Sequence, residues 1–141
     1  MSDIKSFDET NQEITILAEL GINVDNLSEV KEFCKSYSKV VLENEPDVIE
    51  FTFFYSELDR GITLVEKYKD SSAFINHTIN ISVGGILEYQ FQKLVKIFSV
   101  KSIKILGTCS EELIKSNEKL DLTFDYRQCV GGCVRFLNGS S

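Results

Sequence analysis

The chain has no tryptophan, one proline and one histidine in its 141 residues, and its basic residues are outnumbered. It carries 15 lysines and arginines against 22 aspartates and glutamates, which gives a formal charge of −7. Because nucleic acids and anionic membranes are bound through basic surfaces, this charge argues against both as partners. No apolar run approaches the roughly 20 residues of a membrane-spanning helix. The N-terminus has no basic-then-apolar signal pattern, so we expect a soluble, cytoplasmic protein.

Cysteine is also scarce, with four residues at Cys34, Cys109, Cys129 and Cys133. Small secreted scaffolds that depend on disulfides carry far more cysteine for their length. A zinc site needs paired, closely spaced ligands, and only Cys129 and Cys133 are near each other in the sequence. We therefore expect reduced thiols and no metal site, with Cys129 and Cys133 as the alternative candidate pair for redox or metal chemistry.

The rest of the composition is that of one globular domain, with 43% hydrophobic and 26% charged residues. The length fits a single domain of roughly 100–150 residues. Residues 1–12 are polar and are expected to form a disordered or extended N-terminal arm. Residues 13–141 are expected to form the domain itself.

Hydrophobic periodicity predicts alternating strands and helices. Apolar side chains alternate strictly from Ile14 to Ile22, which is typical of a strand, whereas spacings of three and four follow Leu27, which is typical of an amphipathic helix. Asn26 is a predicted N-cap for that helix, and Pro46 follows its end. The predicted elements in chain order are a strand over 14–22, a helix over 27–44, strands over 48–57 and 62–68, helices over 70–81 and 87–98, and a strand over 100–107.

The C-terminal region has weaker signals. Thr108 and Glu111 have the spacing of a capping box and predict a short helix that ends near Asn117. The segment 122–137 is expected to form a last strand or a hairpin about Gly131-Gly132.

The order β-α-β-β-α-β is that of the ferredoxin-like, split-βαβ plan, an α+β fold with an antiparallel four-stranded sheet and its helices on one face. Four apolar residues are predicted on the other face, where these helices cannot cover them: Leu17, Val48, Phe54 and Val65. An apolar sheet face of this kind normally packs against something. A second copy of the chain is the simplest partner, so we expect a homodimer that forms through the sheet face.

A family resemblance rests on two stretches of the sequence. One is Glu45-Pro46-Asp47 with the strand after it, and the other is Glu66-Lys67-Tyr68-Lys69-Asp70-Ser71, followed by His77 and Asn80. Over residues 13–115 the chain resembles the antibiotic-biosynthesis-monooxygenase-like proteins of the dimeric α+β barrel superfamily. Asp47 stands where that family usually has glycine, and the tryptophan on which its oxygenases and haem degraders generally rely is missing. The resemblance implies a dimeric ferredoxin-like fold and cofactor-free oxidation of a small aromatic or quinol.

Glu66 is the most telling single residue in the predicted strands. It falls in register with Ile62, Leu64 and Tyr68 on an otherwise apolar strand face. A carboxylate buried there must be paired, hydrogen-bonded or protonated. It is a candidate base with a raised pKa or an anchor for a substrate hydroxyl, and alternatively a structural acceptor that orients His77 or a backbone amide.

His77 is the only histidine, and imidazole is well suited to move protons near neutral pH. It shares the inward stripe of its helix with Phe74 and Ile81, so it is predicted to face the sheet surface that bears Glu66. A base at this place can take a proton from a phenol or hydroquinone. The alternative is a core histidine whose hydrogen bonds are satisfied within the protein.

The remaining candidate site residues would bind the substrate. Asn80 lies one turn after His77 and either hydrogen-bonds a ligand or caps the helix. Seven aromatic residues either line a pocket for a planar ligand or form plain core. Five of them are the predicted substrate-binding residues, Phe51, Phe53, Tyr55, Tyr68 and Phe74, and the other two are Tyr89 and Phe91.

Three functions follow as competing hypotheses. The first is a cofactor-independent monooxygenase-like enzyme for a small aromatic or quinol substrate, with His77 as base and Glu66 orienting it. The second is a non-catalytic, ligand-binding or stress-related dimer that has kept the barrel without the chemistry, which the missing tryptophan favours. The third makes Cys129 and Cys133 a redox pair.

Overall fold

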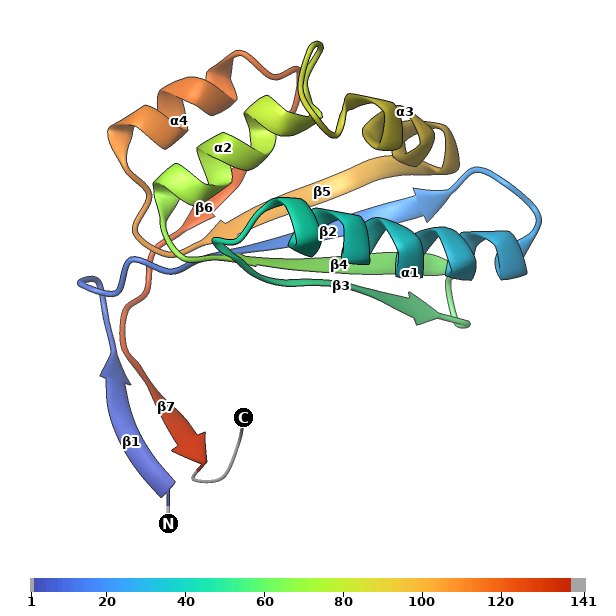
Figure 1. The fold of residues 1–141 in the computed structure, drawn as a ribbon. Helices are drawn as coiled ribbons and strands as arrows, with labels where there is room; N and C mark the ends of the chain where they lie inside the picture. Colours follow the sequence, from blue (N-terminus) through green and yellow to red (C-terminus); the bar gives the residue numbers. More distant parts are fainter. Residues whose placement is uncertain (1, 138–141) are drawn as a thin grey trace.

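A computed structural model describes residues 2–137 of the chain (Figure 1). In this part of the chain one sheet has the strand order β3-β4-β2-β5-β6, and a second sheet pairs β1 with β7. The elements are β1 (Ser2–Phe7), β2 (Ile14–Ile22), α1 (Leu27–Asn44), β3 (Val48–Ser56), β4 (Gly61–Tyr68), α2 (Ser71–Ile81), α3 (Glu88–Ile97), β5 (Phe98–Leu106), α4 (Glu111–Glu118), β6 (Asp125–Arg127) and β7 (Gly132–Leu137).

The architecture is the predicted ferredoxin-like α+β fold. Strands β3, β4, β2 and β5 are antiparallel neighbours, and the helices lie over one face of their sheet (Figure 1). One strand extends the predicted four: β6 pairs in parallel with β5, so the main sheet is mixed. The core between the sheet and the helices is where the candidate site lies.

Local sequence explains the central strand and the first helix. Ile14, Ile16 and Ala18 of β2 are buried, as their alternation predicts. The side chain of Asn26 accepts a hydrogen bond from the Glu29 amide at 3.2 Å, so the predicted N-cap of α1 is confirmed.

Strand β3 begins with a bulge that the sequence pattern did not indicate. Its register with β4 shifts between Val48 and Glu50. Val48 is consequently buried, at 7% exposure, whereas Ile49 is 52% exposed. The sequence analysis placed Val48 on the open face, and this placement is wrong because a bulge adds one residue to a strand and changes which face its neighbours occupy.

The predicted break after α2 is present and has a steric cause. Gly84 has φ of 86°, and a Cβ added to Gly85 would lie 2.2 Å from the Asn80 carbonyl oxygen. The backbone therefore packs against the end of α2 at a distance that only glycine allows. Ser82 is the C-cap of α2, so the expectation that Asn80 caps this helix is wrong.

The two ends of the chain pair with each other. Residues 2–7, within the segment expected as a disordered or extended arm, form the extended strand β1, which pairs antiparallel with β7. The tail hairpin about Gly131-Gly132 is not formed, because β6 pairs with β5 and β7 pairs with β1. Ser110 is the N-cap of helix α4, and its side chain accepts from the Leu113 amide. The predicted cap Thr108 instead donates to the Glu9 carbonyl.

The sheet face opposite the helices has no covering element in residues 2–137 (Figure 1). Leu17 and Val65 are paired at its centre and half-buried, and Phe54 is 54% exposed. The predicted open face therefore keeps Leu17, Phe54 and Val65 and loses Val48 to the core.

Within the described part of the chain, no helix is both long enough and apolar enough to cross a membrane.

The four cysteines are free thiols, and the Cys129 thiol donates to the Phe7 carbonyl oxygen at 3.3 Å.

Candidate active site

Three buried side chains with acid-base chemistry converge between the sheet and α2. Glu45 is the C-cap residue of α1, Glu66 lies on β4, and His77 lies on the inward face of α2. Their exposed fractions are 3%, 8% and 4%. Charged groups are rarely buried to this degree without partners, so their hydrogen bonds decide what the site can do.

His77 is oriented by Glu45. The imidazole Nδ1 lies 2.6 Å from Glu45 Oε1, and the Asn80 amide donates to Glu45 Oε2 at 2.7 Å. A carboxylate can only accept hydrogen bonds, so this contact places the proton of a neutral imidazole on Nδ1. Nε2 then keeps its lone pair and is the atom of His77 that can accept a proton.

Glu66 lies on the other side of the imidazole. Its Oε1 is 4.0 Å from His77 Nε2, which is too long for a hydrogen bond, and accepts a hydrogen bond of 2.5 Å from the Tyr68 hydroxyl. Tyr68 and Glu66 are two residues apart on β4, so both side chains leave the same face of the sheet. The sequence analysis expected Glu66 to orient His77, and in the structure Glu45 does so instead.

Burial sets the protonation of this group of side chains. Desolvation raises the pKa of Glu66 above its ordinary value of 4.5, against the opposing effects of the His77 charge and the Tyr68 hydrogen bond. The pKa of Tyr68 is raised as well, first by burial and then by the neighbouring Glu66. Desolvation therefore favours the protonated form of Glu66, the form in which a carboxyl can donate a proton.

A cavity of about 140 Å³ lies against these groups. Both His77 and Glu66 line it, and nearly all of its other lining residues are apolar. An apolar cavity of about 150 Å³ holds one benzene ring, so the space fits a single aromatic ring. Its aromatic lining residues are Tyr37, Phe51, Phe74, Phe91, Phe98 and Phe124.

The predicted substrate-binding residues fall into three places. Phe51 and Phe74 line the cavity. Phe53 and Tyr55 line a separate groove between α1 and β3, which Phe51 also borders. The other two predicted residues are not among the cavity's lining residues. Tyr68 instead donates to Glu66, which lines the cavity, and Asn80 donates to Glu45, which orients His77.

Sequence reasoning missed Glu45 and Tyr37. Glu45 belongs to the Glu-Pro-Asp stretch quoted for the family resemblance, but its position at a helix end gave no sign that it would be buried. Tyr37 fits the apolar stripe of α1, yet it lines the cavity, and burial raises its pKa with added contributions from Glu66 and Glu45. Only the packing of α1 on the sheet brings Glu45 to His77 and Tyr37 to the cavity.

Comparisons with known proteins place this fold. No protein-family model and no curated protein matches the chain. Among solved structures, MupZ from Pseudomonas fluorescens has a TM-score of 0.66 at 18% identity, over 84% of this chain and 90% of that one. SnoaB, a cofactor-independent oxygenase from Streptomyces nogalater, has a TM-score of 0.53 at 12% identity, over 67% and 90%. A Bacteroides thetaiotaomicron protein assigned as an antibiotic biosynthesis monooxygenase gives 0.50 at 19%, over 67% and 85%.

These likenesses are at the level of the backbone. The protein has the ferredoxin-like α+β fold found in antibiotic-biosynthesis-monooxygenase-like proteins. The ferredoxin-like architecture that the sequence resemblance implied is confirmed, whereas the dimer that it also implied stays a prediction. At identities of 12–19% these likenesses establish the fold alone, and the chemistry has to be inferred from the residues of the site.

Proposed function

We propose that the protein is a cofactor-independent monooxygenase-like enzyme that oxidises a small phenol or hydroquinone held in the cavity beside His77. The observation that supports this function is the cavity of about 140 Å³, which has room for one aromatic ring and contacts both His77 and Glu66. A phenol in this space has an acidic proton for the base and an apolar ring for the walls.

The proposed reaction begins with proton transfer from the phenol to His77 Nε2. Glu45, 2.6 Å from Nδ1, stabilises the imidazolium that forms. The electron-rich phenolate then reacts with molecular oxygen, which is the second substrate. The ring carbon para to the phenolate oxygen forms a bond to oxygen and then loses its hydrogen as the O–O bond breaks. One oxygen atom is retained in a quinone and the other leaves as water, so the substrate supplies all the electrons. The phenolic and ring hydrogens supply the two hydrogens of the water overall, which leaves His77 neutral and Glu66 protonated at the end of the cycle. Glu66 as a neutral acid supplies a proton to the departing oxygen.

Oxygen uptake tests this proposal. Phenols and hydroquinones of one ring are offered to the wild type, His77→Ala and Glu66→Gln, with dissolved oxygen followed by electrode. Loss of a general base lowers turnover by about 10²–10⁴-fold, which is expected for His77→Ala. Full turnover in both variants would exclude the mechanism, and unchanged far-ultraviolet circular dichroism would confirm that they fold.

The second candidate is a non-catalytic ligand-binding dimer with the same cavity. The absence of tryptophan from the sequence favours it, because the oxygenases that the sequence resembles generally rely on that residue. Binding of phenol in the cavity without oxygen uptake by any substrate offered would support this function over the first.

We also propose that two copies of the chain associate through the open sheet face. Its support is the apolar pair Leu17 and Val65 at the centre of that face, together with the exposed ring of Phe54. An apolar patch on one face of a sheet suits a two-fold interface, because each copy then covers the same patch of the other.

A further inference from the structure

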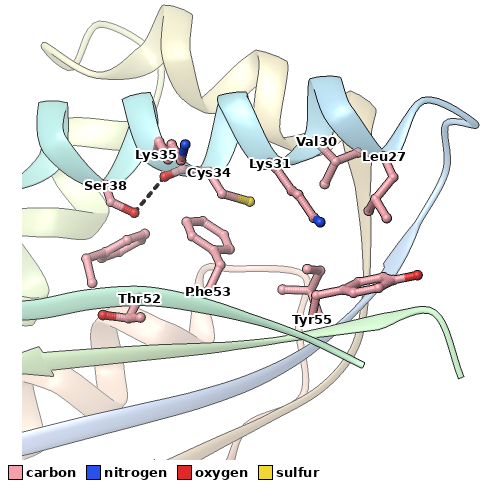
Figure 2. A pocket seen from close by; sticks show the side chains of 11 residues that line it. Leu27, Val30, Lys31, Cys34, Lys35, Ser38, Thr52, Phe53 and Tyr55 are labelled. Carbon is pink, nitrogen blue, oxygen red and sulfur yellow. Dashed lines mark hydrogen bonds between the residues drawn. The ribbon is translucent and has the colours of Figure 1, made fainter. Parts of the chain in front are cut away.

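A groove between α1 and β3 lies outside the site described above. Its volume is about 390 Å³, and we call it the α1–β3 groove, lined mainly by Leu27, Val30, Lys31, Cys34, Phe53 and Tyr55. Figure 2 shows the rings of Phe53 and Tyr55 standing on β3 below the side chains of α1. The walls are therefore apolar, and the opening is on the outer surface of the molecule.

The charge at this groove is opposite to that of the whole chain. The protein carries a formal charge of −7, yet the charged residues that line the groove are both lysines, Lys31 and Lys35. Lys35 is 3.6 Å from Glu32 on the same helix. Lys31 has no carboxylate within 4.0 Å among residues 2–137, and its side chain extends from α1 into the gap above β3 (Figure 2).

We propose that the α1–β3 groove binds a monocarboxylic acid with an apolar body, its carboxylate on Lys31 and its hydrocarbon against Phe53 and Tyr55. One ammonium beside an apolar floor matches a ligand with one negative charge and an apolar chain. The lysine stem adds apolar surface to the wall, as long charged side chains do. This inference does not rest on the proposed oxidation, because the groove holds neither His77 nor Glu66.

Cys34 provides a local reporter of occupancy. Its side chain points towards Phe53 inside the groove (Figure 2), and burial raises the pKa of its thiol to about 11. It therefore reacts slowly with alkylating agents, and a ligand in the groove would slow it further. Cys109 is a matched internal control, because it is also half-buried with a raised pKa but lies outside the groove.

The test uses octanoate, octanol and octylamine as probes on the full chain, with calorimetry for affinity and peptide mass spectrometry for alkylation of each cysteine. We expect octanoate to bind most tightly and to protect Cys34 without protecting Cys109. Lys31→Gln should weaken octanoate about threefold to fivefold, as loss of one exposed ion pair does. Lys96→Gln on α3 is the control and should leave octanoate binding unchanged.

A charge reversal sharpens the result. Lys31→Glu should abolish the preference for octanoate and favour octylamine, because the sign of the only groove charge without a partner is inverted. Equal binding of octanoate and octanol to the wild type would overturn the proposal, as would octanoate binding that leaves Cys34 unprotected. Neither result bears on oxygen uptake at His77, so failure here and failure of the proposed function are distinguishable.

Discussion

His77 is hydrogen-bonded at Nδ1 to Glu45, 2.6 Å away, and not to Glu66, whose Oε1 lies 4.0 Å from Nε2. The two carboxyl groups therefore have different roles on opposite sides of one imidazole. Glu45 orients the ring through Nδ1, while Glu66 and His77 are both lining residues of the cavity. This separation is what lets one site hold a base and an acid at the same time.

The first prediction concerns the tautomer of His77. Glu45→Gln replaces a carboxylate, which only accepts, with an amide that can also donate, so the Nδ1–H form loses its preference. Because the chain has one histidine, its ring nitrogen resonances report the tautomer without overlap. We expect a single Nδ1–H form in the wild type and a mixture in the variant, with a loss of stability of about 1 kcal/mol. Glu43→Gln, two residues away and exposed, should change neither quantity.

The second prediction is a pH dependence that comes from Glu66. Its pKa is raised in the folded protein, so between 4.5 and the folded value the native state keeps a proton that the unfolded chain releases. Stability from this group is complete below 4.5 and falls as the pH rises through the folded pKa, by about 1.4 kcal/mol for each unit by which that pKa is raised.

Urea unfolding across the pH range measures this effect. The glutamine of Glu66→Gln cannot ionise, so the variant does not lose this stability as the pH rises. The free energy of unfolding of the variant minus that of the wild type should therefore increase above pH 4.5. Glu57→Gln, at an exposed position beyond β3, should follow the wild type. A pH-independent difference for Glu66→Gln would show that Glu66 has the same pKa in both states.

The third prediction tests the cavity directly. Ala18 lines it from the central strand β2 and is 5% exposed. Ala18→Leu adds three carbons to empty apolar space, which should raise stability by about 1 kcal/mol and abolish phenol binding. Thermal unfolding and ligand-observed NMR with phenol make the two measurements. Stronger phenol binding in the variant would place the ligand elsewhere.

The fourth prediction concerns the open sheet face. Val65→Lys places a charge at the centre of the proposed interface and should convert a dimer into a folded monomer. Size-exclusion chromatography with light scattering gives the mass of each species. Leu58→Lys, at a position 98% exposed in the turn after β3, is the control and should keep the wild-type mass. A wild type that is monomeric at every concentration would refute the interface.

Much of the fold was readable from local patterns. Strict alternation from Ile14 to Ile22 identifies β2, because successive side chains of a strand point to opposite faces. The Asn26 cap and the spacing of three and four after it identify α1, because residues at that spacing share one face of a helix. Val48 was misplaced since a bulge leaves the apolar pattern intact while changing the face that a residue occupies. The pairing of β1 with β7 was missed because nothing local to either strand specifies a partner more than a hundred residues away.

By itself the sequence determined the order of strands and helices from β2 to α4, and it singled out His77 and Glu66 as polar residues on apolar faces. Those properties depend on neighbours within a few positions of the chain. Only the tertiary structure decided that Glu45 directs His77, because a helix end, a strand and a second helix must first pack together. It also decided the size of the cavity, since empty space remains only where side chains from separate elements do not meet.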